Sequence, residues 1–153
     1  MKPFRKNVAV AIDGGGIRGV IVTRALAMLE DYLGQNVHDI FRLVAGTSTG
    51  SIISAGIGAG ISARQMHQLY SELGDMAFKK SWRYYLWPLT RYRYPYEPLK
   101  EVFKQYIGDM NMGDFWASDP PTDVVITAFD LQENRTRFIK SWKEAYKNWS
   151  VIK

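Results

Sequence analysis

The sequence contains no cysteine among its 153 residues, so disulfide bonds and thiolate chemistry are excluded. Long apolar runs are also lacking. The longest, SIISAGIGAGIS at 51–62, consists largely of small residues and is too short to cross a bilayer. The basic start, MKPFRKN, is followed by too few apolar residues before Asp13 to form the core of a secretory signal. We therefore expect a cytoplasmic protein with no membrane-spanning segment.

The composition that remains is that of one globular domain spanning residues 1–153. Its 46% hydrophobic and 23% charged fractions are ordinary for such a domain. The net charge of +5 is unevenly distributed, because KKSWRYYLWPLTRYRYPY at 79–96 combines basic and aromatic residues with no acid. This segment favours contact with an anionic membrane surface. Binding of single-stranded nucleic acid, or partial packing of the aromatic rings in the core, are the alternatives.

Alternating strand and helix patterns predict the fold class. Short apolar runs bounded by turn residues predict strands at 7–12, 41–45, 123–129 and 135–142. Helical spacing predicts helices at 18–33, at 51–60, from Ser62 onward and from Pro98 onward. We expect an α/β fold, a three-layer α/β/α arrangement with a mainly parallel central sheet and a final antiparallel hairpin.

Particular buried faces follow from the same spacing. The first predicted helix carries apolar residues at helical spacing, Ile21, Met28 and Tyr32 among them, and the last predicted helix is expected to bury Tyr106 in its apolar stripe. Gly34 is expected to end the first helix. In such a fold, ligands bind at the carboxyl ends of the parallel strands, where two glycine clusters of this sequence fall.

One of these clusters, GTSTG, is a G-x-S-x-G motif formed by Gly46, Ser48 and Gly50. In a nucleophile elbow, the serine lies on a strained strand-to-helix turn, and the flanking glycines allow the close approach that the turn requires. The following helix adds its N-terminal dipole to the stabilisation of a developing oxyanion. A simple loop of small residues is the alternative interpretation of the motif alone.

The other cluster is DGGGIRG, in which Gly14, Gly16 and Gly19 have the G-x-G-x-x-G spacing of a dinucleotide-binding turn. That use needs an acid at the end of the following strand. The available acids, Glu30 and Asp31, fall on the predicted first helix instead. No G-K-[ST] follows, so a phosphate-binding loop of the P-loop type is not favoured either.

An oxyanion hole makes a different use of the same loop. The N–H groups of Gly14, Gly15 and Gly16 are in a position to face the anionic oxygen that forms when Ser48 attacks an ester. Arg18 is expected to hold that loop or to meet a substrate phosphate. A solvent-facing role for Arg18 is the alternative.

Both motifs together resemble the patatin-like phospholipases, which are lipid acyl hydrolases with a Ser-Asp dyad. The resemblance rests on DGGGIRG at 13–19 and GTSTG at 46–50 at this separation. It continues in YEPLKEVFKQYIGD at 96–109 and VVITAFDLQENRTRFIKSW at 124–142, and so covers nearly the whole chain. It implies a patatin-like domain in which the serine of GTSTG is the nucleophile and the glycines and arginine of DGGGIRG form the oxyanion loop.

The family's catalytic aspartate lies in a D-G-[GA] motif downstream of the serine. The only Asp-Gly pair here, Asp13-Gly14, belongs to the oxyanion loop. We therefore expect the catalytic aspartate to lie outside this chain and the domain to be incomplete at its C-terminus. Asp114, Asp123 and Asp130 follow the serine, but each is expected to be a turn or cap acid.

The implied activity is phospholipase A-type ester hydrolysis in lipid degradation, acting on membrane phospholipid or another acyl lipid without metal or cofactor. His38 and His67 are expected to have structural roles. With a lipid substrate, residues 79–96 are expected to make peripheral membrane contact, and no nucleic acid is expected to bind. Two alternatives stay open: a catalytically incomplete patatin-fold module that binds lipid or a partner protein, and a nucleotide-binding α/β domain.

Overall fold

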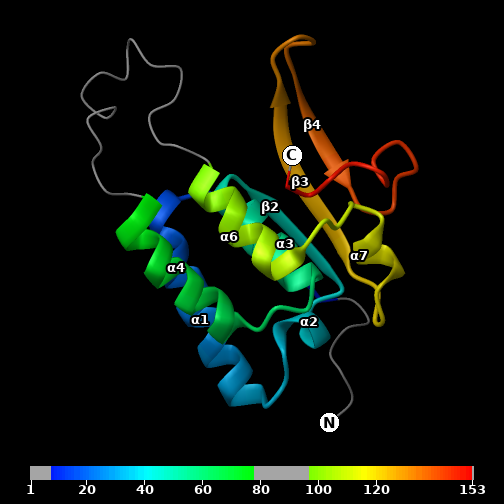
Figure 1. The fold of residues 1–153 in the computed structure, drawn as a ribbon. Coiled ribbons are helices and arrows are strands. Elements are labelled where there is room, and N and C mark those ends of the chain that lie inside the picture. Colours follow the sequence, from blue (N-terminus) through cyan, green and yellow to red (C-terminus); the bar gives the residue numbers. More distant parts are fainter. Residues whose placement is uncertain (1–7, 78–96, 153) are drawn as a thin grey trace, which may run out of the picture.

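A computed structural model describes residues 8–77 and 97–152 of the chain (Figure 1). The aromatic and basic segment 79–96, for which the sequence predicts membrane contact, lies outside the described residues. The helices and strands on either side of it form an α/β fold with a four-stranded sheet, as predicted.

The sheet has the strand order β1-β2-β3-β4 and is mostly parallel. Strands β1 (Ala9–Ile12), β2 (Leu43–Thr47) and β3 (Asp123–Asp130) run parallel, and β4 (Arg135–Lys140) returns antiparallel to β3. All four predicted strands and the final hairpin are thereby confirmed. The parallel strands end at the same edge of the sheet, which is the edge where both glycine clusters follow.

Among the described residues, four longer helices accompany the sheet: α1 (Gly19–Leu33), α3 (Thr49–Gly58), α4 (Ala63–Ala77) and α6 (Glu97–Ile107). Their positions agree with the predicted ones. Helix α1 ends at Gly34 with φ 63°, and α4 begins at the predicted capping box, in which the Gln65 N–H donates to Ser62 Oγ. The sequence analysis missed three short helical turns, η2 (Gly16–Arg18), α2 (Val37–Ile40) and α7 (Asp114–Ala117).

Helix α3 lies directly against the three parallel strands, and α1 and α4 pack together beside it (Figure 1). Its small residues make this close packing feasible: a methyl group added at Gly58 would lie within 3.0 Å of Val124 and Phe115 side-chain atoms. Ile53 and Ile57 of α3 are buried in the same core. Ser48, which directly precedes α3, is therefore held at the start of a helix that is largely buried.

Several apolar helix residues are exposed, and the expected burial of Tyr106 is wrong. Ile21, Met28 and Tyr32 are 66%, 59% and 87% exposed, because α1 carries apolar residues around most of its circumference and buries only the side that faces its neighbours. Tyr106 of α6 is likewise 42% exposed. Helical spacing shows on which side of a helix an apolar residue lies. Where a helix has apolar residues on two sides, the spacing does not show which side is buried in the fold.

Glu30 of α1 joins two other helices through its carboxylate. One oxygen accepts hydrogen bonds from the N–H of Val37 at 2.9 Å, and both oxygens lie 3.0 Å from the N–H of Ala63. These groups belong to the first turns of α2 and α4, whose leading N–H groups have no partner inside their own helix. A negative charge at a helix N-terminus is also favoured by the helix dipole. Glu30 thus fixes α1, α2 and α4 relative to one another.

Candidate active site

Ser48 occupies the turn between β2 and α3 with φ 54° and ψ −124°. A residue other than glycine that has a positive φ is strained by about 1–3 kcal/mol, and such strain persists only where the surrounding structure imposes it. Ser48 is exposed, and its hydroxyl makes no capping bond to the helix that it precedes. The turn is therefore a strained strand-to-helix connection with an accessible hydroxyl, the geometry typical of a G-x-S-x-G elbow.

The turn requires glycine at positions 46 and 50, because there is no room for a side chain at either. A Cβ atom on Gly46 would collide with the backbone of Gly50, and a Cβ atom on Gly50 would collide with the carbonyl group of Ile12. The second collision involves the last residue of β1, which shows how closely the start of α3 approaches that strand. The two glycines of the elbow thus let β2 and α3 fold back on each other and against β1.

The glycine-rich loop after β1 lies against the serine. A Cβ atom built on Gly14 would lie 2.8 Å from Ser48 Cβ and 3.5 Å from Ser48 Oγ. Both residues are exposed. Gly14 and Ser48, 34 positions apart in the sequence, therefore lie side by side at the carboxyl ends of β1 and β2.

The three glycine amides of this loop differ in their partners. The Gly15 N–H donates to Thr49 Oγ1 at 3.0 Å. Within residues 8–77 and 97–152, no acceptor is found for the N–H of Gly14 or of Gly16. Gly16 has φ 57°, a conformation that favours glycine, and it begins the 3₁₀ turn η2. Two of the three amides are thus available to an external anion.

Arg18 braces the loop from the end of η2. Its backbone N–H donates to the Gly15 carbonyl at 3.2 Å, and its Nε donates to the same oxygen at 3.4 Å. The side chain is exposed, so the guanidinium group stays accessible to solvent. Of the roles considered for Arg18 from the sequence, holding the loop is the one that these hydrogen bonds support.

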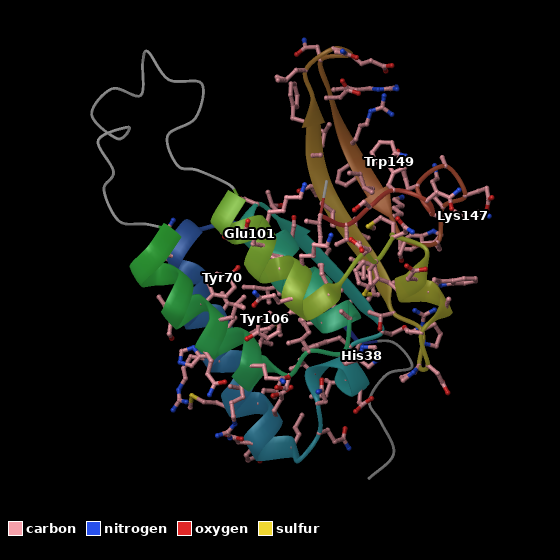
Figure 2. All side chains as sticks on the ribbon, in the orientation of Figure 1. His38, Tyr70, Glu101, Tyr106, Lys147 and Trp149 are labelled. Atoms are coloured by element: carbon pink, nitrogen blue, oxygen red, sulfur yellow. The ribbon has the colours of Figure 1, made fainter. Side chains whose placement is uncertain are left out.

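Tyr70 of α4 connects the elbow to the helix layer (Figure 2). Its hydroxyl donates to the backbone carbonyl of Thr49 at 2.9 Å, and its ring occupies the space beside Gly19 that a Cβ atom there would need. Burial raises the pKa of the Tyr70 phenol far above its usual range, so the hydroxyl stays protonated as a donor. Tyr70 therefore contacts the residue after Ser48 and the residue after Arg18.

Thr127 of β3 supports the elbow from the opposite side. Its hydroxyl lies 2.8 Å from Thr47 Oγ1 and 3.2 Å from the Gly46 carbonyl oxygen, both on the strand that leads into Ser48. The sequence analysis assigned no role at the site to Thr49, Tyr70 or Thr127. A hydroxyl beside each motif was visible in the sequence, but its partner depends on contacts between distant segments.

Three aspartates considered from sequence have other partners: Asp114 and Asp130 are turn acids, as expected, whereas Asp123 begins a strand and forms an ion pair. Asp114 Oδ2 accepts the Asn111 N–H at 2.8 Å, which is a turn interaction. Asp123 pairs with Arg42 at 3.0 Å near the opposite end of the parallel strands. Asp130 accepts backbone N–H groups within its own hairpin turn. None of these carboxylates is hydrogen-bonded to Ser48.

Both histidines have partners within the fold. His38 Nδ1 lies 2.8 Å from the Ile57 carbonyl oxygen (Figure 2), and His67 Nδ1 lies 3.3 Å from Thr23 Oγ1. Neither is on the elbow. In the part of the chain that the structure describes, no three His, Asp or Glu residues cluster in a way that could hold a metal ion. No described helix is long and apolar enough to span a membrane.

The fold and the turn at Ser48 together define a class of protein. It is an α/β domain with an exposed serine on a strained strand-to-helix turn, beside a glycine-rich loop. A family model described as "Patatin-like phospholipase" matches residues 10–150. The chain belongs to the patatin-like phospholipase family.

Three relatives illustrate the range of the match. The "cGAMP-activated phospholipase" of Pseudomonas aeruginosa is 29% identical over 86% of this chain, and "Patatin-like protein 1" of Oryza sativa subsp. indica is 31% identical over 85%. The "Intracellular phospholipase A2" of Caenorhabditis elegans is 45% identical over 45% of this chain. The matched segments make up 39%, 34% and 6% of these relatives, so the chain spans well under half of their length.

Proposed function

We propose that this domain hydrolyses the acyl esters of lipids, with Ser48 as the nucleophile. The single observation that carries the proposal is the strained, exposed Ser48 in contact with the glycine-rich loop. Membership of a family whose model is described as a phospholipase supports it. So do relatives named phospholipases, one of them "Phospholipase A I" of Arabidopsis thaliana.

In the proposed reaction, Ser48 Oγ attacks the ester carbonyl carbon and its proton passes to a general base. The tetrahedral intermediate expels the alcohol, and water then releases the fatty acid from the acyl-enzyme. The N–H groups of Gly14 and Gly16 are the proposed oxyanion donors, since the Gly15 N–H is directed to Thr49. The N-terminus of α3 adds its positive end of the helix dipole to the same region.

The general base is proposed to be an aspartate from outside the described residues. This part of the proposal rests on the family resemblance and on the partners found for Asp114, Asp123 and Asp130, which leave Ser48 without a hydrogen-bonded carboxylate from any of the three. The same observation favours a second candidate function, a module that binds lipid or a partner protein without turnover.

A fluorophosphonate probe separates these two functions in the full-length protein. Hydrolysis by Ser48 predicts covalent labelling that disappears in Ser48→Ala and persists in Ser71→Ala, an exposed serine on α4 whose hydroxyl donates to the His67 carbonyl. Labelling that survives in Ser48→Ala contradicts the assignment of the nucleophile. Absence of labelling in the unmodified full-length protein contradicts the enzyme and leaves the binding module.

A further inference from the structure

The hairpin of β3 and β4 projects past the edge of the sheet at which Ser48 lies (Figure 1). Strand β2 ends at Thr47, which pairs with Thr127, whereas β3 continues for three more residues before the turn. Four positions separate Thr127 from Leu131, the first residue of the turn. At about 3.3 Å per residue, Leu131 lies about 13 Å beyond the end of β2 along the strand direction. The hairpin therefore stands beside the proposed nucleophile as a protrusion of the fold.

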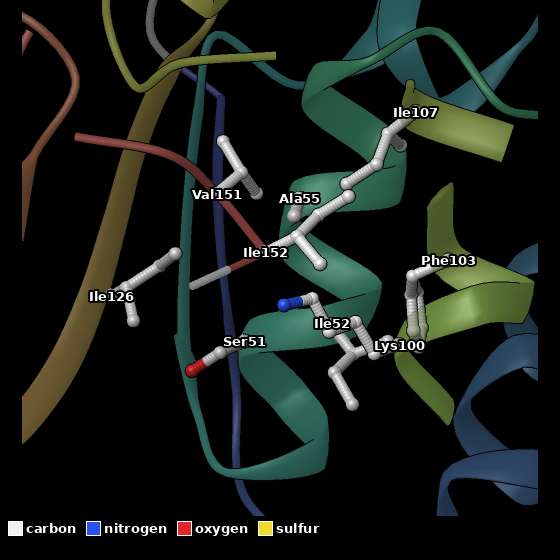
Figure 3. A pocket seen from close by; sticks show the side chains of 9 residues that line it. All are labelled: Ser51, Ile52, Ala55, Lys100, Phe103, Ile107, Ile126, Val151 and Ile152. Carbon is white, nitrogen blue, oxygen red and sulfur yellow. The ribbon is translucent and has the colours of Figure 1, made fainter. Parts of the chain in front are cut away.

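One face of this hairpin is aromatic and open to solvent. Ile126 of β3 lines the apolar pocket beside α3 that Figure 3 shows. Side chains alternate between the two faces of a strand, so Phe129 lies on the opposite face, away from α3. Phe138 shares that face, because it pairs in the sheet with Thr127. Both phenylalanine side chains are more than half exposed.

The charged residues at the end of the hairpin are paired with one another. They are two acids and two bases: Asp130, Glu133, Arg135 and Arg137. Arg137 Nε lies 2.6 Å from Asp130 Oδ2, and Arg137 Nη2 lies 3.4 Å from Glu133 Oε1. Arg135 also forms an ion pair with Glu133. The end of the hairpin therefore has no net charge, and each of its guanidinium groups already has a carboxylate partner.

The turn holds Leu131 in a defined conformation. Asp130 Oδ1 accepts the N–H of Gln132 at 3.0 Å and the N–H of Glu133 at 3.1 Å. Asn134 completes the turn with φ 48°, a conformation that asparagine tolerates. Leu131 is 86% exposed. An apolar side chain held in water gains free energy when a partner covers it, and a hydrogen-bonded turn loses little conformational entropy in doing so.

We propose that the hairpin tip, defined as Phe129, Leu131 and Phe138, docks the domain on a zwitterionic lipid surface. Exposed apolar clusters mark contacts with membranes or with proteins. Position favours the membrane here, because the hairpin tip lies at the edge of the sheet where Ser48 has to meet a lipid. This choice of partner rests on the proposed hydrolysis of lipid esters. The paired charges favour a surface without net charge, since no guanidinium of the hairpin is left over for an anionic headgroup.

Vesicle binding by the full-length protein tests the hairpin tip. The protein carries Ser48→Ala, so that hydrolysis does not alter the vesicles. The vesicles are phosphatidylcholine, because the net charge of +5 attracts anionic vesicles to any part of the chain. We expect Leu131→Ser to weaken binding by about tenfold, the effect of losing one buried leucine side chain. Binding before this substitution is expected to be the same in about 0.1 M and about 1 M salt, because apolar contacts are not screened.

Met28→Ser is the matched control. Met28 is an exposed apolar residue of α1, nine positions after the helix start at Gly19 and therefore away from the edge at Ser48. Its substitution is expected to leave vesicle binding unaltered. Phe129→Ser is a second hairpin variant, and circular dichroism checks that each protein is folded. If a folded Leu131→Ser protein and a folded Phe129→Ser protein bind vesicles as tightly as Met28→Ser, the proposal is overturned.

Further outcomes separate failure of the docking surface from failure of the enzyme. Hairpin-dependent binding, with no hydrolysis of vesicle lipid by protein that retains Ser48, upholds the surface and contradicts the enzyme. Hydrolysis with binding that the hairpin variants leave intact contradicts the surface alone. Absence of vesicle binding overturns the lipid surface. If sedimentation velocity then shows a dimer that Leu131→Ser dissociates, the hairpin tip contacts a second copy of the chain instead.

Discussion

The hydroxyl of Tyr70 donates a hydrogen bond to the backbone carbonyl of Thr49, the residue directly after the proposed nucleophile. The distance is 2.9 Å, and the phenol is buried in the packing between α4 and its neighbours. Tyr70 is separated from the elbow by twenty residues of sequence, yet it fixes the first residue of α3. It therefore belongs to the apparatus that positions Ser48, although it does not touch the proposed reacting atoms.

Tyr70→Phe removes this hydrogen bond and keeps the ring that packs beside Gly19. We expect kcat to fall severalfold with little change in KM, because the substitution alters the orientation of the nucleophile and not the surface that binds the substrate. The free energy of unfolding is expected to fall by about 1 kcal/mol. Steady-state kinetics and urea unfolding of the full-length protein measure both quantities.

Tyr32→Phe is the matched control, because Tyr32 is 87% exposed on α1. The same chemical change there is expected to leave both quantities unaltered. A Tyr70→Phe protein that loses stability but keeps its kcat shows a purely structural tyrosine.

Thr49 is the acceptor for the Gly15 N–H, and its substitution tests whether this bond shapes the oxyanion loop. Thr49→Val has nearly the same volume but leaves the N–H unsatisfied, at a cost of about 1–3 kcal/mol. We expect kcat to fall about tenfold, since about 1.4 kcal/mol of lost transition-state stabilisation corresponds to that factor. Fluorophosphonate labelling rates provide an independent readout.

Thr49→Ser retains a hydroxyl at the same position and is expected to recover most of the activity that Thr49→Val loses. A Thr49→Val protein that keeps its kcat while Thr49→Ser loses activity contradicts a role for the hydroxyl and points to the methyl group instead.

Glu30→Gln tests the carboxylate that caps two helices at once. The amide retains one acceptor oxygen but loses the charge and the second acceptor, so one N–H group of Val37 or Ala63 is left with a poorer partner. We expect a loss of about 1–3 kcal/mol in the free energy of unfolding. Thermal and urea unfolding measure it.

Its neighbour Asp31 supplies the control, because its ion pair with Arg64 at 2.6 Å is largely exposed to solvent. Asp31→Asn is expected to change stability by less than about 1 kcal/mol. If the two variants are equally stable, the carboxylate of Glu30 does not have the capping role described here.

Asp130 makes stability depend on pH. Hydrogen bonds from the Glu133 N–H and from Arg137 hold the pKa of its carboxyl below the usual value in the folded state. Its stabilising contribution is therefore present above the unfolded-state pKa of about 3.9 and is lost as pH falls through the lower, folded-state value. We expect Asp130→Asn to be less stable than the parent protein at neutral pH and equal to it in strong acid.

Urea unfolding over a series of pH values gives the comparison, and the NMR titration of the Asp130 carboxyl gives the folded-state pKa directly. A difference in stability that stays constant from neutral pH into strong acid contradicts this role of the hairpin turn.

Local signals in the sequence were sufficient for most elements. Ser62 and Gln65 predict the start of α4 through a capping box, and Gly34 predicts the end of α1 through its left-handed conformation. The motif at Ser48 is also visible locally, because its two glycines lie two residues on either side of the serine, although the space that Gly50 has to leave free is set by Ile12 of β1. Such features depend on a few neighbouring residues and can be recognised without knowledge of the fold.

Features that depend on distant contacts could not be predicted in the same way. The bond between Gly15 and Thr49 exists because β1 and β2 are adjacent strands that end side by side. The exposure of Tyr32 depends on which side of α1 the other helices cover. Within the candidate site, the sequence identifies the two motifs but not the hydroxyl groups of Tyr70 and Thr127 that hold them in place.

The fit of Gly14 against Ser48, with 2.8 Å between a hypothetical Cβ and the Cβ of the serine, has a consequence for protein engineering. Neither motif can be transplanted alone into another α/β scaffold, because each supplies the empty space that the other occupies. A designer who grafts the serine turn has to bring the glycine loop with it, at the same strand spacing. Variation at Gly14 is likewise coupled to the serine turn, because any side chain there needs Thr47 and Ser48 to shift.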